Sequence, residues 1–246
     1  MTLIISMCTK DAIYMIADQK LIKDYGDFYE DGGRVQKIIQ INNRVVASFW
    51  GLDLSQDIDN FKKSILPEEE LDSISIKLKD YLERNKNLDF DDSCGVHLAG
   101  YIGNAHQLRH IFHENWLQKN QFINENSSIE SHQSLGEKEG SMIIGYKKII
   151  LNSNFPILFN GENSIPNLII NGVKLYGDII PYSDLCEDKA KTFLKLLLDF
   201  ALNIQKFREE FIFKKNISIG YPINFCTILQ SGDIKIDTIK ENENTN

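Results

Sequence analysis

The stretch that decides the fold is residues 2–18, which read TLIISMCTKDAIYMIAD. Two short apolar runs, 3–9 and 12–17, are rich in β-branched residues and are separated by Lys10 and Asp11. Apolar runs of this length bounded by polar residues are typical of buried strands. The sequence therefore predicts a core β-hairpin within its first residues.

Further strands and helices are predicted on both sides of a second hairpin. Residues 35–41 and 45–50 form that hairpin, because Asn42 and Asn43 tolerate the positive φ of a tight turn. Apolar residues recur at helical spacing over 52–65 and again over about 69–85. The remaining expected elements are strands at 95–102, 108–112, 141–150 and 156–160, a short helix after Pro166, a long helix from Asp184 to about Phe207, and a closing hairpin of 223–230 and 234–239. A polar, glycine-containing loop is expected over 23–33.

This order of elements predicts one layered domain. Strands come first, then a helix pair, then strands, helices and strands, which is typical of an α+β protein with antiparallel sheets. We expect a four-layer α/β/β/α sandwich, in which two antiparallel sheets pack face to face and helix pairs cover their outer faces. Residues 1–246 then form a single domain, with a surface excursion at 120–140 and a frayed tail at 241–246.

Composition excludes several classes of protein. The 246 residues carry 27 Lys and Arg against 35 Asp and Glu, a formal charge of −8, and 42% are hydrophobic. An acidic chain is a poor binder of nucleic acid, because phosphate neutralisation drives such binding. No apolar run approaches the roughly 20 residues of a membrane span. The four cysteines form no CxxC and no signal peptide is evident, so we expect a cytoplasmic protein with reduced thiols.

Four residues at characteristic spacing form the candidate catalytic set. Asp18 follows Thr2 by sixteen residues, Lys37 lies within VQKIIQIN (35–42), and Gly51, fourteen residues later, ends ASFWG (47–51). This pattern resembles the start of a proteasome β-type subunit, and of the related bacterial two-ring peptidase, in the N-terminal nucleophile hydrolase superfamily. The resemblance covers residues 2–65 well and the closing hairpin passably, while the middle agrees only in the order of elements.

The resemblance implies an N-terminal threonine hydrolase of peptide or amide bonds. After removal of Met1, the Thr2 hydroxyl would attack, and its own α-amine, with a pKa near ~8, would act as general base. A buried Lys37 ammonium would assist proton transfer, Asp18 would keep that ammonium charged and oriented, and the Gly51 N–H would stabilise the oxyanion. The mechanism requires no metal or organic cofactor.

The same resemblance implies a substrate pocket and an oligomer. The pocket beside the nucleophile would be lined by Leu21, Val35, Ile39, Phe49 and Asp53, with Phe49 partly filling its floor, which favours small or medium apolar side chains. Val35, Ile39 and Phe49 are equally compatible with ordinary core positions. Partners would be a peptide or amide substrate and further copies of the chain, in a dimer or ring, with no nucleic acid and no membrane.

Three supporting positions depart from the family pattern. Glu162 stands where a serine is expected, Asn216 where an aspartate is expected, and Ile219 where a second serine is expected. Ser218 substitutes for that serine only if the alignment slips by one residue. Replacing the side chains that hold a reactive group in place lowers its activity. A catalytically inactive, proteasome-like structural or assembly subunit is therefore the main alternative, and a non-peptide amidase is a third.

Each residue of the set also has an ordinary structural explanation. Thr2 suits a strand start, Asp18 a turn, Lys37 a half-buried strand that snorkels to water, and Gly51 a break before a helix. The metal-site alternative rests on His106, His110 and His113. Strand alternation places His110 and His113 on opposite faces, so we expect surface histidines there.

Overall fold

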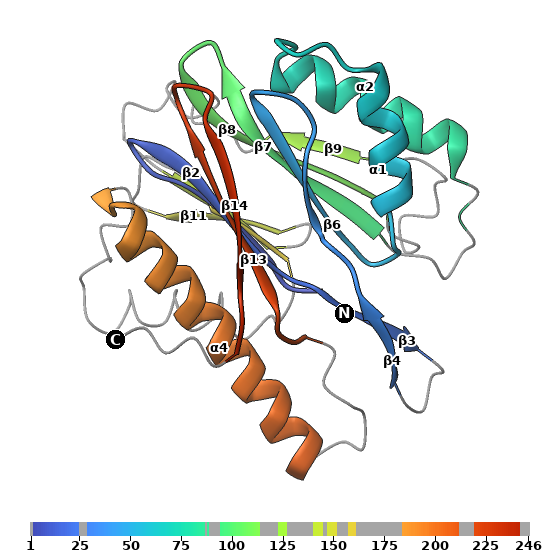
Figure 1. Ribbon diagram of the computed structural model, residues 1–246, viewed down its shortest axis with the longest axis vertical. Coiled ribbons are helices and arrows are strands. Elements are labelled where there is room, and N and C mark those ends of the chain that lie inside the picture. Colours follow the sequence, from blue (N-terminus) through green and yellow to red (C-terminus); the bar gives the residue numbers. More distant parts are fainter. Residues whose placement is uncertain are drawn as a thin grey trace.

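The computed structural model describes residues 2–24, 29–86, 88, 94–113, 123–126, 140–144, 147–151, 157–160, 184–211 and 219–241, and every structural statement below concerns these residues. They form three β-sheets and three α-helices (Figure 1).

The larger sheet is built around the predicted first hairpin. Strands β1 (Ile4–Cys8) and β2 (Ala12–Asp18) are fully buried and pair antiparallel, with Ile4 opposite Ala17. The order of the seven strands is β11-β10-β12-β1-β2-β13-β14. The other members are β10 (Gly140–Ile144), β11 (Lys147–Leu151), β12 (Ile157–Asn160), β13 (Ile223–Leu229) and β14 (Ile234–Ile239).

A second sheet of five strands lies against the first. Its order is β5-β6-β7-β8-β9, and every neighbouring pair is antiparallel. The strands are β5 (Ile38–Gln40), β6 (Val45–Trp50), β7 (Cys94–Ile102), β8 (Ala105–His113) and β9 (Ile123–Asn126). A separate two-stranded sheet, β3 (Lys20–Asp24) with β4 (Tyr29–Arg34), projects from the edge of the molecule (Figure 1).

Three apolar clusters hold these elements together. Helix α4 (Glu187–Phe211) packs its buried face on β1, β2 and β13 of the seven-stranded sheet. Helices α1 (Ser55–Phe61) and α2 (Leu71–Asn85), joined by a 3-10 turn at Lys62–Ser64, pack on the five-stranded sheet. The third cluster lies between the two sheets, where alternate residues of β1, β2, β6, β7, β8 and β13 face one another.

The predicted four-layer α/β/β/α sandwich of two antiparallel sheets is wrong. The described residues are mostly β-structure, with fourteen strands against three α-helices. The larger sheet is mixed, because β10 and β12 run parallel, and the two-stranded sheet was not expected. A helix pair, α1 and α2, covers the five-stranded sheet. Among the described residues, α4 is the single helix that packs on the seven-stranded sheet. The expected helix after Pro166 lies outside the described residues.

Other expectations are corrected locally. The expected loop at 23–33 contains most of β4 and the end of β3, whose pairing is irregular between Leu21 and Ile22. The single strand expected at 141–150 is two strands, β10 and β11. Most of the expected excursion at 120–140 and the tail beyond Glu241 lie outside the described residues, although β9 falls within the former. None of the helices described is both long and apolar enough to span a bilayer.

Candidate active site

The first hairpin brings Thr2 and Asp18 to the same end of the seven-stranded sheet. Asp18 is the last residue of β2, and its N–H donates to the Leu3 carbonyl at 3.3 Å. In return, the Leu3 N–H donates to Asp18 Oδ1 at 2.9 Å. The Lys20 N–H donates to the other carboxylate oxygen, Oδ2, at 3.1 Å. These bonds fix the carboxylate directly beside the residue that follows Thr2.

Lys37 reaches this end of the sheet from the neighbouring sheet. It immediately precedes β5, and its Nζ donates to Asp18 Oδ2 at 3.0 Å, to Thr2 Oγ1 at 3.2 Å and to the Lys20 carbonyl at 2.6 Å. The exposed fractions are 1% for Lys37, 0% for Asp18 and 7% for Thr2. The structure therefore brings three of the four predicted catalytic residues into direct contact in a nearly water-free setting.

Burial sets the protonation of the pair. Desolvation lowers the pKa of Lys37, and the Asp18 carboxylate opposes that shift. Desolvation raises the pKa of Asp18, while the Lys37 charge and the Leu3 N–H oppose it. An ammonium has three donors and no acceptor, and three oxygens surround it here. The charged form is thus fully hydrogen-bonded, and burial makes release of its proton less costly than in water.

Gly51 lies at the matching end of the β5–β6 pair. It follows β6 directly, and its φ of +78° is a left-handed conformation that favours glycine. Ile38 pairs with Ser48, and the antiparallel register carries Lys37 and Gly51 toward the same end of the two strands. The glycine is exposed, which leaves its backbone open to solvent.

The five expected pocket residues fall into two groups. Ile39 and Phe49 are 8% and 1% exposed and belong to the apolar cluster beneath α1 and α2. Leu21, Val35 and Asp53 each keep some exposed surface. The Asp53 carboxylate accepts the Ser55 N–H at 2.9 Å, just before α1, whose N-cap residue is Leu54.

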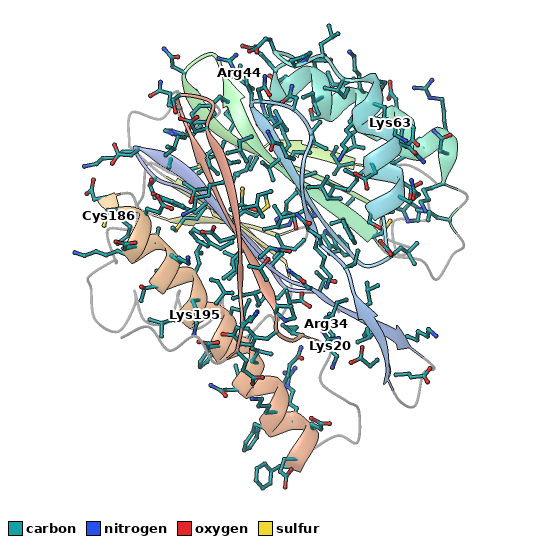
Figure 2. The ribbon with its side chains drawn as sticks, viewed as in Figure 1. Lys20, Arg34, Arg44, Lys63, Cys186 and Lys195 are labelled. Carbon is teal, nitrogen blue, oxygen red and sulfur yellow. The ribbon has the colours of Figure 1, made fainter. Side chains whose placement is uncertain are left out.

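Two cations flank the site. Lys20 and Arg34 are cross-strand partners on β3 and β4 and lie close together in Figure 2. Arg34 binds Asp31 and also donates to the Tyr221 carbonyl at 3.2 Å, which ties β4 to the segment before β13. Sequence reasoning did not single out Lys20, because its backbone carbonyl and not its side chain contacts Lys37.

The supporting positions are only partly described. Glu162, Asn216 and Ser218 lie outside the described residues. Ile219 is 1% exposed within the cluster beneath α4, and its N–H donates to Gln205 Oε1 at 3.1 Å. At this position the chain has an apolar core contact and no hydroxyl.

The expected surface histidines are instead buried. His106, His110 and His113 are at most 9% exposed, since β8 is covered on both faces. In the described part of the chain, no group of three or more His, Cys, Asp or Glu is arranged to hold a metal ion.

Comparison with known proteins identifies the fold. No protein-family model and no curated protein matches the sequence. Solved structures do match. One of them, the Anbu (Gly-1) mutant from Hyphomicrobium sp. strain MC1, has a TM-score of 0.62 and 12% identity, and the match covers 99% of this chain and 89% of that one. A second Anbu structure from that strain has a TM-score of 0.61 and 13% identity over 98% of this chain and 89% of that one. Anbu (ancestral beta-subunit) from Yersinia bercovieri gives 0.55 and 15%, over 98% of this chain and 88% of that one. The chain has a proteasome-like fold.

These neighbours correct the family resemblance drawn from the sequence. The assignment to the N-terminal nucleophile peptidases that include the bacterial two-ring peptidase is wrong, because the three neighbours named above are Anbu structures, a proteasome-like group that is not of the two-ring type. The sequence pattern of Thr2, Asp18, Lys37 and Gly51 did not distinguish Anbu proteins from two-ring peptidases. At 12–15% identity the likeness to Anbu concerns the fold alone.

Proposed function

We propose that the chain is an N-terminal threonine hydrolase of peptide or amide bonds, active after removal of Met1. The observation that carries the proposal is the contact of the buried Lys37 Nζ with both Thr2 Oγ1 and the Asp18 carboxylate. A threonine hydroxyl is a weak nucleophile and needs an adjacent base and a means of stabilising the alkoxide. A lysine fixed at 3.2 Å supports the second requirement, and the freed α-amine of Thr2 would supply the first.

The proposed roles follow from the chemistry of each group. Thr2 Oγ1 forms the bond to the substrate carbonyl carbon while its proton passes to the Thr2 amine. The same proton then passes to the substrate nitrogen as the amide C–N bond breaks and the amine product leaves. Water hydrolyses the resulting ester and restores Thr2. Asp18 orients Lys37, and the Gly51 N–H donates a hydrogen bond to the developing oxyanion. Leu21, Val35, Ile39, Phe49 and Asp53 remain the proposed pocket for a small or medium apolar side chain.

Labelling with an electrophilic β-lactone tests the proposal. Attack by Thr2 opens the lactone ring and forms an ester without a leaving group, so intact mass rises by the full mass of the reagent. We expect the adduct to map to Thr2, to persist in Thr2→Ser and to vanish in Thr2→Ala. Thr192→Ala is the matched control, because Thr192 is an exposed residue of α4 whose loss leaves the site untouched.

The alternative function is a catalytically inactive, proteasome-like assembly subunit. Ile219, an apolar residue buried where the sequence pattern expects a serine, favours it. An inactive subunit has no need to lose Met1 and takes up no label, whereas the enzyme must lose Met1 because an extra residue blocks the amine. A protein with full-length mass and no adduct would therefore replace the hydrolase proposal with the subunit proposal.

We further propose a single domain over residues 1–246 that assembles with its own copies in a dimer or ring. The description of one neighbour as an ancestral beta-subunit supports assembly. A cytoplasmic location is supported by the four cysteines, all of which are free thiols.

A further inference from the structure

A row of polar side chains crosses the apolar core between the two sheets. Ser48, His97 and His110 are cross-strand partners on β6, β7 and β8, and each is 0% exposed. Ser6 from β1 reaches the row from the opposite sheet, with its Oγ 3.2 Å from His97 Nδ1. The two imidazole rings lie edge to face with centroids 5.0 Å apart. A buried polar row of this kind costs free energy unless it is hydrogen-bonded.

The row ends on a residue next to the candidate site. Trp50 Nε1 donates to His110 Nε2 at 3.0 Å. An indole nitrogen is only a donor, so Nε2 must hold a lone pair and the bond exists only when that nitrogen carries no proton. Trp50 also covers Gly95, where an added Cβ would lie 2.6 Å from the indole nitrogen. One hydrogen bond and one close backbone approach thus fix the orientation of the ring.

Trp50 immediately precedes Gly51, the proposed oxyanion donor. The indole is 8% exposed and anchored in the inter-sheet cluster, so its position determines where the chain leaves β6. On the other side of the row, Ser6 belongs to β1, which begins two residues after Thr2. The two histidines therefore connect the strand of the nucleophile with the strand of the oxyanion donor.

We propose that His110 is a positioning residue: in its neutral form it fixes Trp50, and through Trp50 the Gly51 backbone, and protonation of the His97–His110 pair releases both. The consequence for activity rests on the proposed function. The effect on Trp50 does not, because it depends only on the hydrogen bond between the two side chains. The site would accordingly lose its oxyanion donor in acid.

The surroundings of the pair favour its neutral form. Burial, and then the neighbouring His110, hold the pKa of His97 well below its usual range. From β1 and β13 the titratable residues on the same apolar layer are Cys8 and Cys226, whose burial raises their thiol pKa values. Tyr101 of β7 and His106 of β8 lie further along the two strands. On β9, Glu125 stands in register with His110.

Nuclear magnetic resonance of the Trp50 indole tests the hydrogen bond directly. The chain has two tryptophans, so Trp116→Phe leaves a single indole N–H signal. Between about pH 7.5 and about pH 4, a range that reaches well below the ordinary histidine pKa because burial lowers the pKa of His97, we expect this signal to move upfield and lose its protection from solvent exchange. Histidine ring signals followed in the same samples should change at the same midpoint. In His110→Gln, whose amide oxygen accepts the indole proton without titrating, the signal should stay constant.

Kinetics of β-lactone labelling test the link to the site. Protonation of the Thr2 amine alone lowers the rate about tenfold for each pH unit below its pKa. In the wild-type chain we expect a steeper fall, approaching about 100-fold per unit, below the midpoint of the indole signal. Rates normalised to each variant's own maximum should return to the tenfold slope in His110→Gln. Gly95→Ala displaces the indole nitrogen from His110 without changing a titratable group, so it should lower the maximal rate and also give the tenfold slope.

The outcomes separate the two proposals. Absence of labelling at every pH, with an indole signal that titrates, overturns the hydrolase proposal and leaves the histidine–tryptophan switch standing. An indole signal that stays constant down to about pH 4 in the folded protein overturns the switch. So does a labelling slope that is equally steep in His110→Gln and in the wild-type chain.

Discussion

Replacing Lys37 by methionine is the most informative single change. Methionine has a similar length and volume, so it removes the ammonium while largely filling the same space. The Asp18 carboxylate, 0% exposed, then loses the partner that lies 3.0 Å away and keeps only its two backbone donors, Leu3 and Lys20. Thr2 Oγ1 loses the hydrogen bond that Lys37 Nζ donates to it at the same time. Stability and labelling should both respond.

The size of the stability loss follows from burial. Removing one partner of a buried ion pair costs about 3–5 kcal/mol, a large part of the roughly 5–15 kcal/mol that stabilises a folded protein. The loss should also depend on pH. Burial already raises the pKa of Asp18, and the Lys37 charge that opposes this shift is gone in the variant. The folded variant then binds more protons than the unfolded chain above the ordinary Asp pKa, so its stability falls as pH rises, by up to about 1.4 kcal/mol per unit.

Urea unfolding at about pH 5 and about pH 7.5, a range above the ordinary Asp pKa, measures both effects. We expect Lys37→Met to be less stable at the higher pH and to take up no β-lactone at either. The double variant Lys37→Met with Asp18→Asn buries no charge and should recover most of the lost free energy while remaining inactive. A single variant as stable as the wild-type chain at both pH values would refute the buried-pair argument. Wild-type labelling in that variant would refute the mechanism.

Three further changes give independent tests. Gly51→Ala places a Cβ at a φ of +78°, so we expect about 1–2 kcal/mol of strain in urea unfolding, together with slower labelling of Thr2. Asp72→Ala removes the ion-pair partner of Arg109, which is 4% exposed on β8. Because Asp72 itself is largely exposed, the free energy of unfolding should fall by about 1–3 kcal/mol in thermal or urea unfolding. Burial lowers the pKa of His97 in the folded chain, so below the ordinary histidine pKa of about 6.5 the unfolded chain binds more protons than the folded one. The free energy of unfolding should therefore fall as pH drops through that value. In His97→Asn, urea unfolding should show a fall that is smaller by about 1.4 kcal/mol per pH unit.

Local pattern predicted the hairpins and helices well. Strands expected at 3–9 and 12–17 are Ile4–Cys8 and Ala12–Asp18, and the helix expected at 69–85 is Leu71–Asn85. The parallel pairing of β10 with β12 was not predictable, because register between distant segments depends on tertiary contacts that no local period encodes. The β3–β4 sheet was missed for a related reason, since glycines and charged residues make 23–33 look like a loop.

At the site, residue type and spacing indicated which side chains to consider, but their contacts depend on the tertiary fold. Thr2, Asp18 and Lys37 meet as expected, although their catalytic roles remain proposals. The backbone partners of Asp18 and Lys37, at Leu3 and Lys20, leave no trace in residue type. The burial of His110 was misjudged, because the sequence does not reveal that β8 is covered on both sides.

Thr2 precedes β1 and Asp18 ends β2 in one sheet, and Lys37 and Gly51 flank strands of the other. A partly folded chain, in which only one of the two sheets has formed, therefore lacks the complete proposed site. Under the proposed function, a newly made polypeptide could not attack its neighbours before its folding was finished. A loss of contact between the two sheets should then abolish β-lactone labelling well before the secondary structure melts.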